Sequence, residues 1–116
     1  MTYKSKYLNF FCYGHDEPVM SEIDNSVADD IHHIIRKSKT HKNQDSIKNL
    51  IAVSRSQHNQ LHSRQISDEQ AQDYHDQFVI SFLLSNRDKI KELDESSLDY
   101  YNSRLIESDP YKPIIK

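Results

Sequence analysis

The sequence predicts an α+β fold in a single domain, on three observations. Two short segments rich in β-branched and other apolar residues, 28–35 and 49–53, flank a long polar loop. Signals for the start of a helix follow the second segment directly, and two later stretches show apolar residues at helical spacing. A chain of 116 residues suits one domain over residues 1–116, with its core motif at 28–64 and a helical extension at 67–108.

The N-terminal half is expected to be mostly extended. Residues 3–13 are rich in aromatic side chains and predict an extended or hairpin-forming segment, ended by the turn-like residues 14–18. The segments 28–35 and 49–53 are then expected to pair as two strands around the polar loop 36–48. This order gives a hairpin with an unusually long connection.

Short polar motifs mark where the helices begin. Ser54 and Gln57 stand at the spacing of a capping box, so either Ser54 or Ser56 is expected to start a helix that runs to about Arg64. A strand, a second strand and a helix therefore follow one another along the chain.

Two C-terminal helices complete the predicted fold. Ser67 and Gln70 form a second capping-box pattern, and the helix after it should run to about Ser85. A third helix is expected after a cap at Ser96 or Ser97. The apolar stripe of the first of these helices should pack in the core and consists of Ala71, Tyr74, Phe78, Phe82 and Leu83.

Composition excludes several classes of protein. The single cysteine, Cys12, rules out an internal disulfide and a four-cysteine zinc site within one copy of the chain. No segment is as apolar as a signal peptide or a membrane span, so we expect a soluble, cytoplasmic protein without a membrane partner.

Positive charge is concentrated in one segment, although the net charge is −3. Residues 31–64 hold seven basic residues against one acidic residue, and five of the seven histidines. Such a patch suits contact with the phosphates of a nucleic acid, whereas a solvated loop surface is the alternative. The candidates for binding the phosphate backbone are Arg36, Lys37, Lys39, Lys42 and Arg55.

Three histidines are candidates for a metal site. His58 and His62, four residues apart on the predicted helix, lie on one helical face, so both rings can reach one ion. His32, on the first predicted strand, can supply a third ligand if the hairpin packs against the helix. Three protein ligands leave coordination sites for water and a phosphate oxygen, which is typical of a catalytic ion.

Three further residues are candidates for the surroundings of that ion. His33 points away from its neighbour on a strand, and its ring can take a proton from an attacking water near neutral pH. Asn49 can brace the long loop or hold the ring of His33. Asp30 is a candidate acceptor for a ligand histidine.

The pattern of two adjacent histidines, an asparagine and a His-x-x-x-His pair, arranged as strand, loop, strand and helix, resembles the HNH or ββα-metal endonuclease family. The resemblance covers residues 28–64, its histidine spacing is similar to that of the nuclease colicins, and residues 45–50 resemble the family's usual lead into the second strand. The two Cys-x-x-Cys pairs that many members use for a structural zinc are missing.

The resemblance implies a ββα-metal (His-Me finger) centre and a specific activity. That activity is metal-dependent hydrolysis or nicking of DNA, with 5'-phosphate and 3'-hydroxyl ends. It also implies one divalent ion, either zinc, nickel, magnesium or manganese, on His32, His58 and His62, with His33 as general base and Asn49 as the middle residue of the motif. Small members of the family often belong to phages, mobile elements or defence systems, so a host cytoplasm is the setting if a phage encodes this chain.

Several alternatives stay open at this point. A DNA-binding regulator with the same fold and an idle site has the same motif, and so does a metal-stabilised interaction domain. RNA is a less favoured substrate than DNA. The acidic region 68–109 and its aromatic stripe also allow a homodimer.

Overall fold

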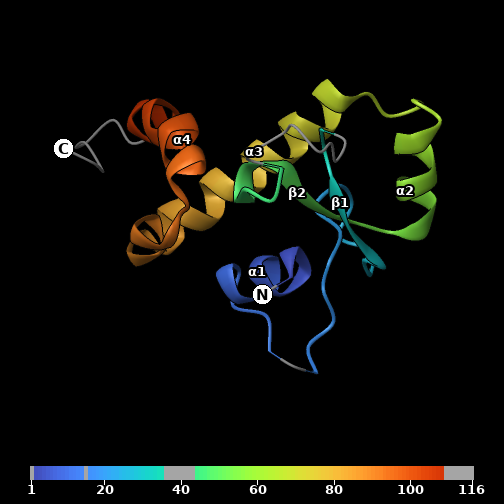
Figure 1. The fold of residues 1–116 in the computed structure, drawn as a ribbon, viewed down its shortest axis with the longest axis horizontal. Helices are drawn as coiled ribbons and strands as arrows, with labels where there is room; N and C mark the ends of the chain where they lie inside the picture. The colour runs from blue at the N-terminus through green and yellow to red at the C-terminus, as the bar shows by residue number, and fades with distance from the viewer. Residues whose placement is uncertain (1, 15, 36–43, 109–116) are drawn as a thin grey trace.

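The computed structural model describes residues 2–14, 16–35 and 44–108. Over these residues the fold is a small antiparallel sheet with helices packed on both of its faces (Figure 1). The predicted α+β class is confirmed. Along the longest axis of the molecule, the helix α2 (Arg55–His62) and the helix α4 (Glu95–Ser108) lie towards opposite ends (Figure 1).

The sheet consists of two short strands. β1 (Asp30–His33) pairs antiparallel with β2 (Leu50–Val53), with Asp30 opposite Val53 and His33 opposite Leu50. β1 is shorter than the predicted segment 28–35, and the end of the predicted loop forms a short 3-10 helix, η1 (Ile47–Asn49). Asn49 therefore stands immediately before the second strand.

The helix α2 follows β2 after a single residue, as predicted. Ser54 caps it: the hydroxyl of Ser54 accepts a hydrogen bond from the backbone N–H of Gln57, and the Gln57 side chain accepts one from the N–H of Ser54. This capping box fixes the first turn of the helix and hence which residues face the sheet.

Two helices complete the described part of the chain, which confirms the predicted C-terminal helices. α3 (Asp68–Ser85) begins at a second capping box formed by Ser67 and Gln70. A 3-10 helix, η2 (Arg87–Glu92), connects it to α4. None of the helices in the described part of the chain is long and apolar enough to cross a membrane.

The predicted cap of α4, Ser96 or Ser97, was wrong by two or three residues. The carboxylate of Asp94 accepts a hydrogen bond from the N–H of Ser97 at 3.0 Å, and α4 begins at Glu95. The hydroxyl of Ser97 is buried and accepts a hydrogen bond from the N–H of Lys48. Ser97 therefore ties α4 to η1 instead of capping the helix.

The N-terminal segment is a helix, and the prediction of an extended segment there was wrong. α1 spans Tyr3–Phe10, and the side chain of Thr2 caps its first turn. Tyr7, Phe10 and Phe11 recur at helical spacing and are all buried in the core. The prediction relied on the β propensity of aromatic residues, which the packing of this helix-spaced set overrides.

β2 is buried on both faces and separates two hydrophobic clusters. Leu50 and Ala52 belong to the larger cluster, together with buried residues of α1, α3 and α4. Ile51 and Val53 belong to the smaller cluster, which includes Leu61 of α2. The smaller cluster thus holds α2 against one face of the sheet.

Candidate metal centre

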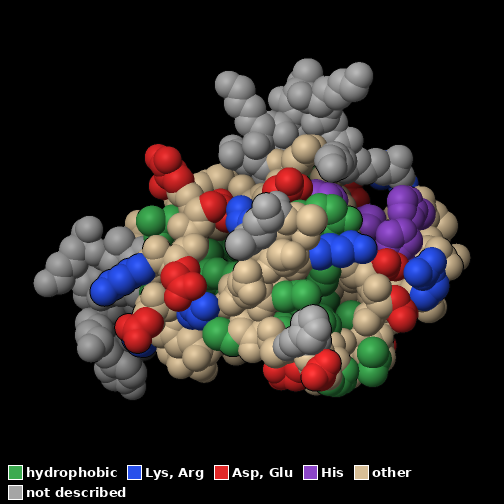
Figure 2. Space-filling model, turned by 60° about the horizontal axis from the view of Figure 1, so that its bottom comes forward, with side chains coloured by type: hydrophobic (Ala, Val, Ile, Leu, Met, Phe, Trp, Pro, Cys, Tyr) green, Lys and Arg blue, Asp and Glu red, His purple; other side chains and the backbone are tan. Residues whose placement is uncertain are grey.

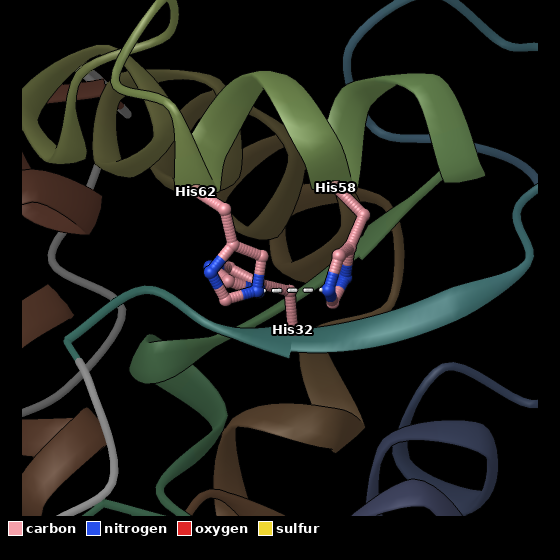
Figure 3. A group of neighbouring side chains, drawn as sticks. All are labelled: His32, His58 and His62. Atoms are coloured by element: carbon pink, nitrogen blue, oxygen red, sulfur yellow. Dashed lines mark hydrogen bonds between the residues drawn. The ribbon is translucent and has the colours of Figure 1, made fainter.

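Two histidines of α2 point from the helix towards β1 (Figure 3). His58 and His62 lie one helical turn apart, and their Nε2 atoms are 2.9 Å from each other. The capping box at Ser54 and the burial of Leu61 fix the helix so that this face is presented to the strand. The i, i+4 spacing alone therefore brings two imidazole nitrogens together.

His32 completes the group from the strand. It lies opposite Ile51 in the sheet, and its ring centroid is 5.2 Å from that of His58 and 5.5 Å from that of His62. One nitrogen from each of the three rings lies within 4.8 Å of the other two. His62 is exposed, and histidine side chains group together on the face of the molecule drawn in Figure 2.

The surroundings of His32 favour its neutral form. Burial, together with the charges of His58 and His62, lowers the pKa of His32 from its usual 6.5 to about 4. His32 is therefore unprotonated at neutral pH, and a neutral imidazole is the form that binds a metal ion.

One ring nitrogen of His58 has no hydrogen-bond partner. The Nδ1 atom of His58 is buried and makes no hydrogen bond, and the nearest carboxylate oxygen, Oδ2 of Asp30, lies 3.6 Å away. The same oxygen lies 3.4 Å from Nε of Arg55. A carboxylate beside the outer ring nitrogen is the kind of neighbour that metal-ligating histidines usually have.

The three histidines fit one divalent ion. Two nitrogens bound to the same tetrahedral zinc lie roughly 3.3 Å apart, so His58 and His62 need to separate by only about half an ångström. Three neutral imidazoles are the donor set preferred by zinc and nickel. The described residues therefore hold three histidines close enough together to share one ion.

His33 lies on the other face of β1. It is largely buried, beside the larger cluster, whereas His32 faces α2. Its Nε2 atom lies 2.7 Å from Oδ1 of Asp45, and the ring of Tyr3 packs against it at 4.4 Å between centroids. The sequence reasoning missed both partners, because no local pattern connects them to His33.

Asn49 braces the loop that joins the two strands. Its Oδ1 atom accepts a hydrogen bond from the N–H of Ile35 at 2.7 Å, and its Nδ2 atom donates to the carbonyls of Ile35 and Gln44. These are the residues on either side of segment 36–43. The sequence suggested that Asn49 either braces the loop or holds the ring of His33. Asn49 braces the loop, and the residue that contacts the ring of His33 is Asp45.

Of the basic residues expected to contact phosphate, only Arg55 lies in the described part of the chain. The side chain of Arg55 is 69% exposed. The backbone N–H of Arg55 donates a hydrogen bond to a carboxylate oxygen of Asp29 at 2.7 Å. Arg36, Lys37, Lys39 and Lys42 lie outside the described residues.

One histidine outside the group carries an unexpected contact. The sequence suggested that His15, His41 and His75 are solvent or packing residues; the first two lie outside the described residues. His75 of α3 is fully buried, with Nδ1 2.6 Å from Oε1 of Glu22 and Nε2 2.6 Å from the carbonyl of Ile47. The ring and the carboxylate form a buried pair, which no spacing in the sequence indicates.

Comparisons with known proteins identify no relative of this chain. No family model, no curated protein and no solved structure matches the chain. The resemblance to the HNH family therefore rests on the histidine and asparagine motif alone. A function has to be argued from the residues of the site.

Proposed function

We propose that this chain is an HNH-type endonuclease that hydrolyses phosphodiester bonds of DNA with the help of one divalent ion. The observation that carries the proposal is the close approach of His32, His58 and His62, with one nitrogen of each ring within 4.8 Å of the others. One ligand from the first strand and two from the helix after the second strand, with a fourth histidine adjacent in sequence, agree with the order of the HNH motif.

The number of ligands supports a catalytic ion rather than a structural one. Three protein ligands leave coordination positions for water and substrate, and the exposure of His62 keeps that side accessible. The chemistry that a bound divalent ion supplies here is polarisation of the phosphate and stabilisation of the leaving 3' oxygen. His32, His58 and His62 would hold the ion, and Asp30, whose Oδ2 atom lies 3.6 Å from Nδ1 of His58, would orient that ring.

In this proposal His33 is the general base. Its neighbour His32 faces the ligand helix, whereas His33 faces the opposite side of the strand and is not a ligand. An imidazole can accept a proton from water near neutral pH and release it afterwards. Asn49 holds the ends of the loop beside it at Ile35 and Gln44, and so maintains the surroundings of the base.

DNA is the proposed substrate because of the charge of the segment that carries the motif. The excess of basic residues over residues 31–64 attracts a polyanion, while acidic residues dominate the rest of the chain. The exposed Arg55 stands at the start of the ligand helix and is positioned to contact a phosphate. RNA is the second substrate to test.

The first experiment is cleavage of supercoiled plasmid by metal-stripped protein with magnesium, manganese, nickel or zinc added back. We expect nicked or linear product that requires the ion and is lost in His33→Ala. Asn59→Ala, on the exposed side of α2, is the matched control and should cleave like the wild type. If no ion supports cleavage of plasmid, single-stranded DNA or RNA while DNA still binds, the chain is a regulator with an idle site.

The ligand assignment has its own test. Calorimetric titration with nickel or zinc should give one site per chain, and alanine at His32, His58 or His62 should weaken binding, whereas His33→Ala should retain it. Equal affinities in the wild type and the three ligand variants would refute the assignment, whatever the cleavage assay shows.

A further inference from the structure

A carboxylate contacts the proposed base from a distant part of the chain. Oδ1 of Asp45 lies 2.7 Å from Nε2 of His33, across twelve positions of sequence. The His33 side chain is 10% exposed and that of Asp45 is 48% exposed. The carboxylate therefore reaches from the surface to a ring that is otherwise buried.

The surroundings hold both partners in place. The ring of Tyr3, from α1, packs on one side of His33 at 4.4 Å. Asn49 binds the carbonyl of Gln44, the residue immediately before Asp45. The base thus has a fixed ring and a carboxylate on a braced segment, which is the arrangement that orients a histidine in many active sites.

The contact determines which nitrogen of His33 carries the proton. A carboxylate can only accept, so Nε2 must be the N–H that donates to Asp45. In a neutral ring Nδ1 is then the nitrogen with a free lone pair. Among the described residues, the only hydrogen bond of the His33 ring is the one at Nε2.

We propose that Asp45 is a positioning residue that fixes the Nε2–H tautomer of His33, so that Nδ1 accepts the proton of the attacking water. The inference rests on the proposed nuclease function. In the step, a water O–H proton passes to Nδ1 and the water oxygen forms a bond to phosphorus. The bond between phosphorus and the 3' oxygen breaks, and that oxygen keeps the electron pair and takes a proton from solvent.

The tautomer is tested without substrate. Long-range nitrogen–proton NMR correlations of the metal-free protein, recorded where the ring is neutral, should show His33 protonated on Nε2. In Asp45→Ala this preference should be lost. Asp45→Asn keeps the shape of the side chain and removes its charge, so it separates loss of the carboxylate from an effect of misfolding. A wild-type ring protonated on Nδ1, or an unchanged tautomer in both variants, would overturn the proposal.

Kinetics test the consequence for cleavage. Asp45→Ala should lower kcat by about 10- to 100-fold with little change in KM or in nickel affinity, and Asp45→Glu, which keeps a carboxylate, should recover part of the loss. Glu69→Ala removes the same charge from an exposed site and should leave kcat unchanged. An unaltered kcat in Asp45→Ala would overturn the proposal. Absence of metal-dependent cleavage in the wild type would refute the nuclease instead, and the NMR result would still decide the tautomer.

Discussion

At the scale of single residues, Asn49 is a buried side chain that connects the two ends of the loop between the strands. It is 4% exposed, and its amide satisfies three backbone groups at once, belonging to Ile35 and Gln44. A buried polar group that loses its hydrogen-bond partner destabilises the folded state, because no water replaces the lost partner. The amide therefore links the end of β1 to the segment that carries Asp45.

We expect Asn49→Ala to lower the free energy of unfolding by about 1 to 3 kcal/mol, since it removes three part-buried hydrogen bonds of one buried side chain. Cleavage should fall with it, whereas nickel affinity should change little because α2 is not involved. Urea unfolding, plasmid cleavage and calorimetry measure the three effects. Asn86→Ala removes a single bond to the carbonyl of Phe82 at an exposed helix end and should cost far less. Equal losses in the two variants would contradict the brace.

Which site residues could be predicted from sequence depends on how local their geometry is. His58 and His62 are brought together by one helical turn, and the alternation of a strand separates His32 from His33. The partner of His33 is twelve positions away and that of His75 fifty-three. Contacts of this kind follow from how the elements pack, and no spacing rule encodes them.

At the scale of elements, α2 depends on a single apolar anchor. Leu61 is 5% exposed and packs in the smaller cluster beside Ile51 and Val53, between the two ligand histidines of the helix. Leu61→Ala should therefore lower the free energy of unfolding of the metal-free protein by about 2 to 5 kcal/mol. The same variant should also weaken nickel binding, because α2 is then no longer held in a fixed position relative to β1 and His32.

Asn59→Ala is the matched control for this change, since Asn59 is on the same helix and is exposed. It should alter neither the urea midpoint nor the nickel affinity by much. Full nickel affinity in Leu61→Ala, despite the lost stability, would mean that the metal itself holds α2 in place.

The elements themselves were predictable to different degrees. Capping boxes at Ser54 and Ser67 located two helices correctly, because a cap is a contact between residues three apart. Residues 3–13 were assigned by the type of side chain, and their helical spacing carried the better information. A helix as short as α1 gains its stability from packing rather than from propensity, which is why composition misled.

At the scale of the whole molecule, a buried network around Glu22 and His75 joins four of the elements. The carboxylate of Glu22 accepts hydrogen bonds from the hydroxyl of Tyr7 and from the N–H of Ala52, and it contacts the ring of His75. The other nitrogen of that ring contacts the carbonyl of Ile47. Both ring nitrogens therefore face acceptors, which indicates a doubly protonated, positively charged His75 beside the carboxylate of Glu22.

The network connects α1, β2, η1 and α3, so its charge state bears on the stability of the whole fold. Burial by itself disfavours the charged ring, but the charge of Glu22, the hydrogen bonds to both ring nitrogens and the nearby Asp76 outweigh it and raise the pKa of His75 above 6.5. Removing one partner of such a pair leaves the other charge buried and uncompensated.

We therefore expect the free energy of unfolding to fall as the pH rises through the raised pKa of His75. The folded protein holds this proton more tightly than the unfolded chain, so the stabilisation is fully present below about pH 6.5, the ordinary value for histidine, and is lost above the native pKa. The titration of His32 does not obscure this loss of stability, because its pKa is lowered from 6.5 to about 4 and its effect on stability is confined to pH values below about 6.5.

Urea unfolding of the metal-free protein at increasing pH measures this loss, with His75→Gln for comparison. The variant should be less stable near neutral pH, and the difference from the wild type should narrow as the pH rises, because the wild type loses its charged ring and the variant has none to lose. Parallel curves would contradict the prediction, since they would mean that the proton of the pair resides on Glu22 and that His75 is neutral.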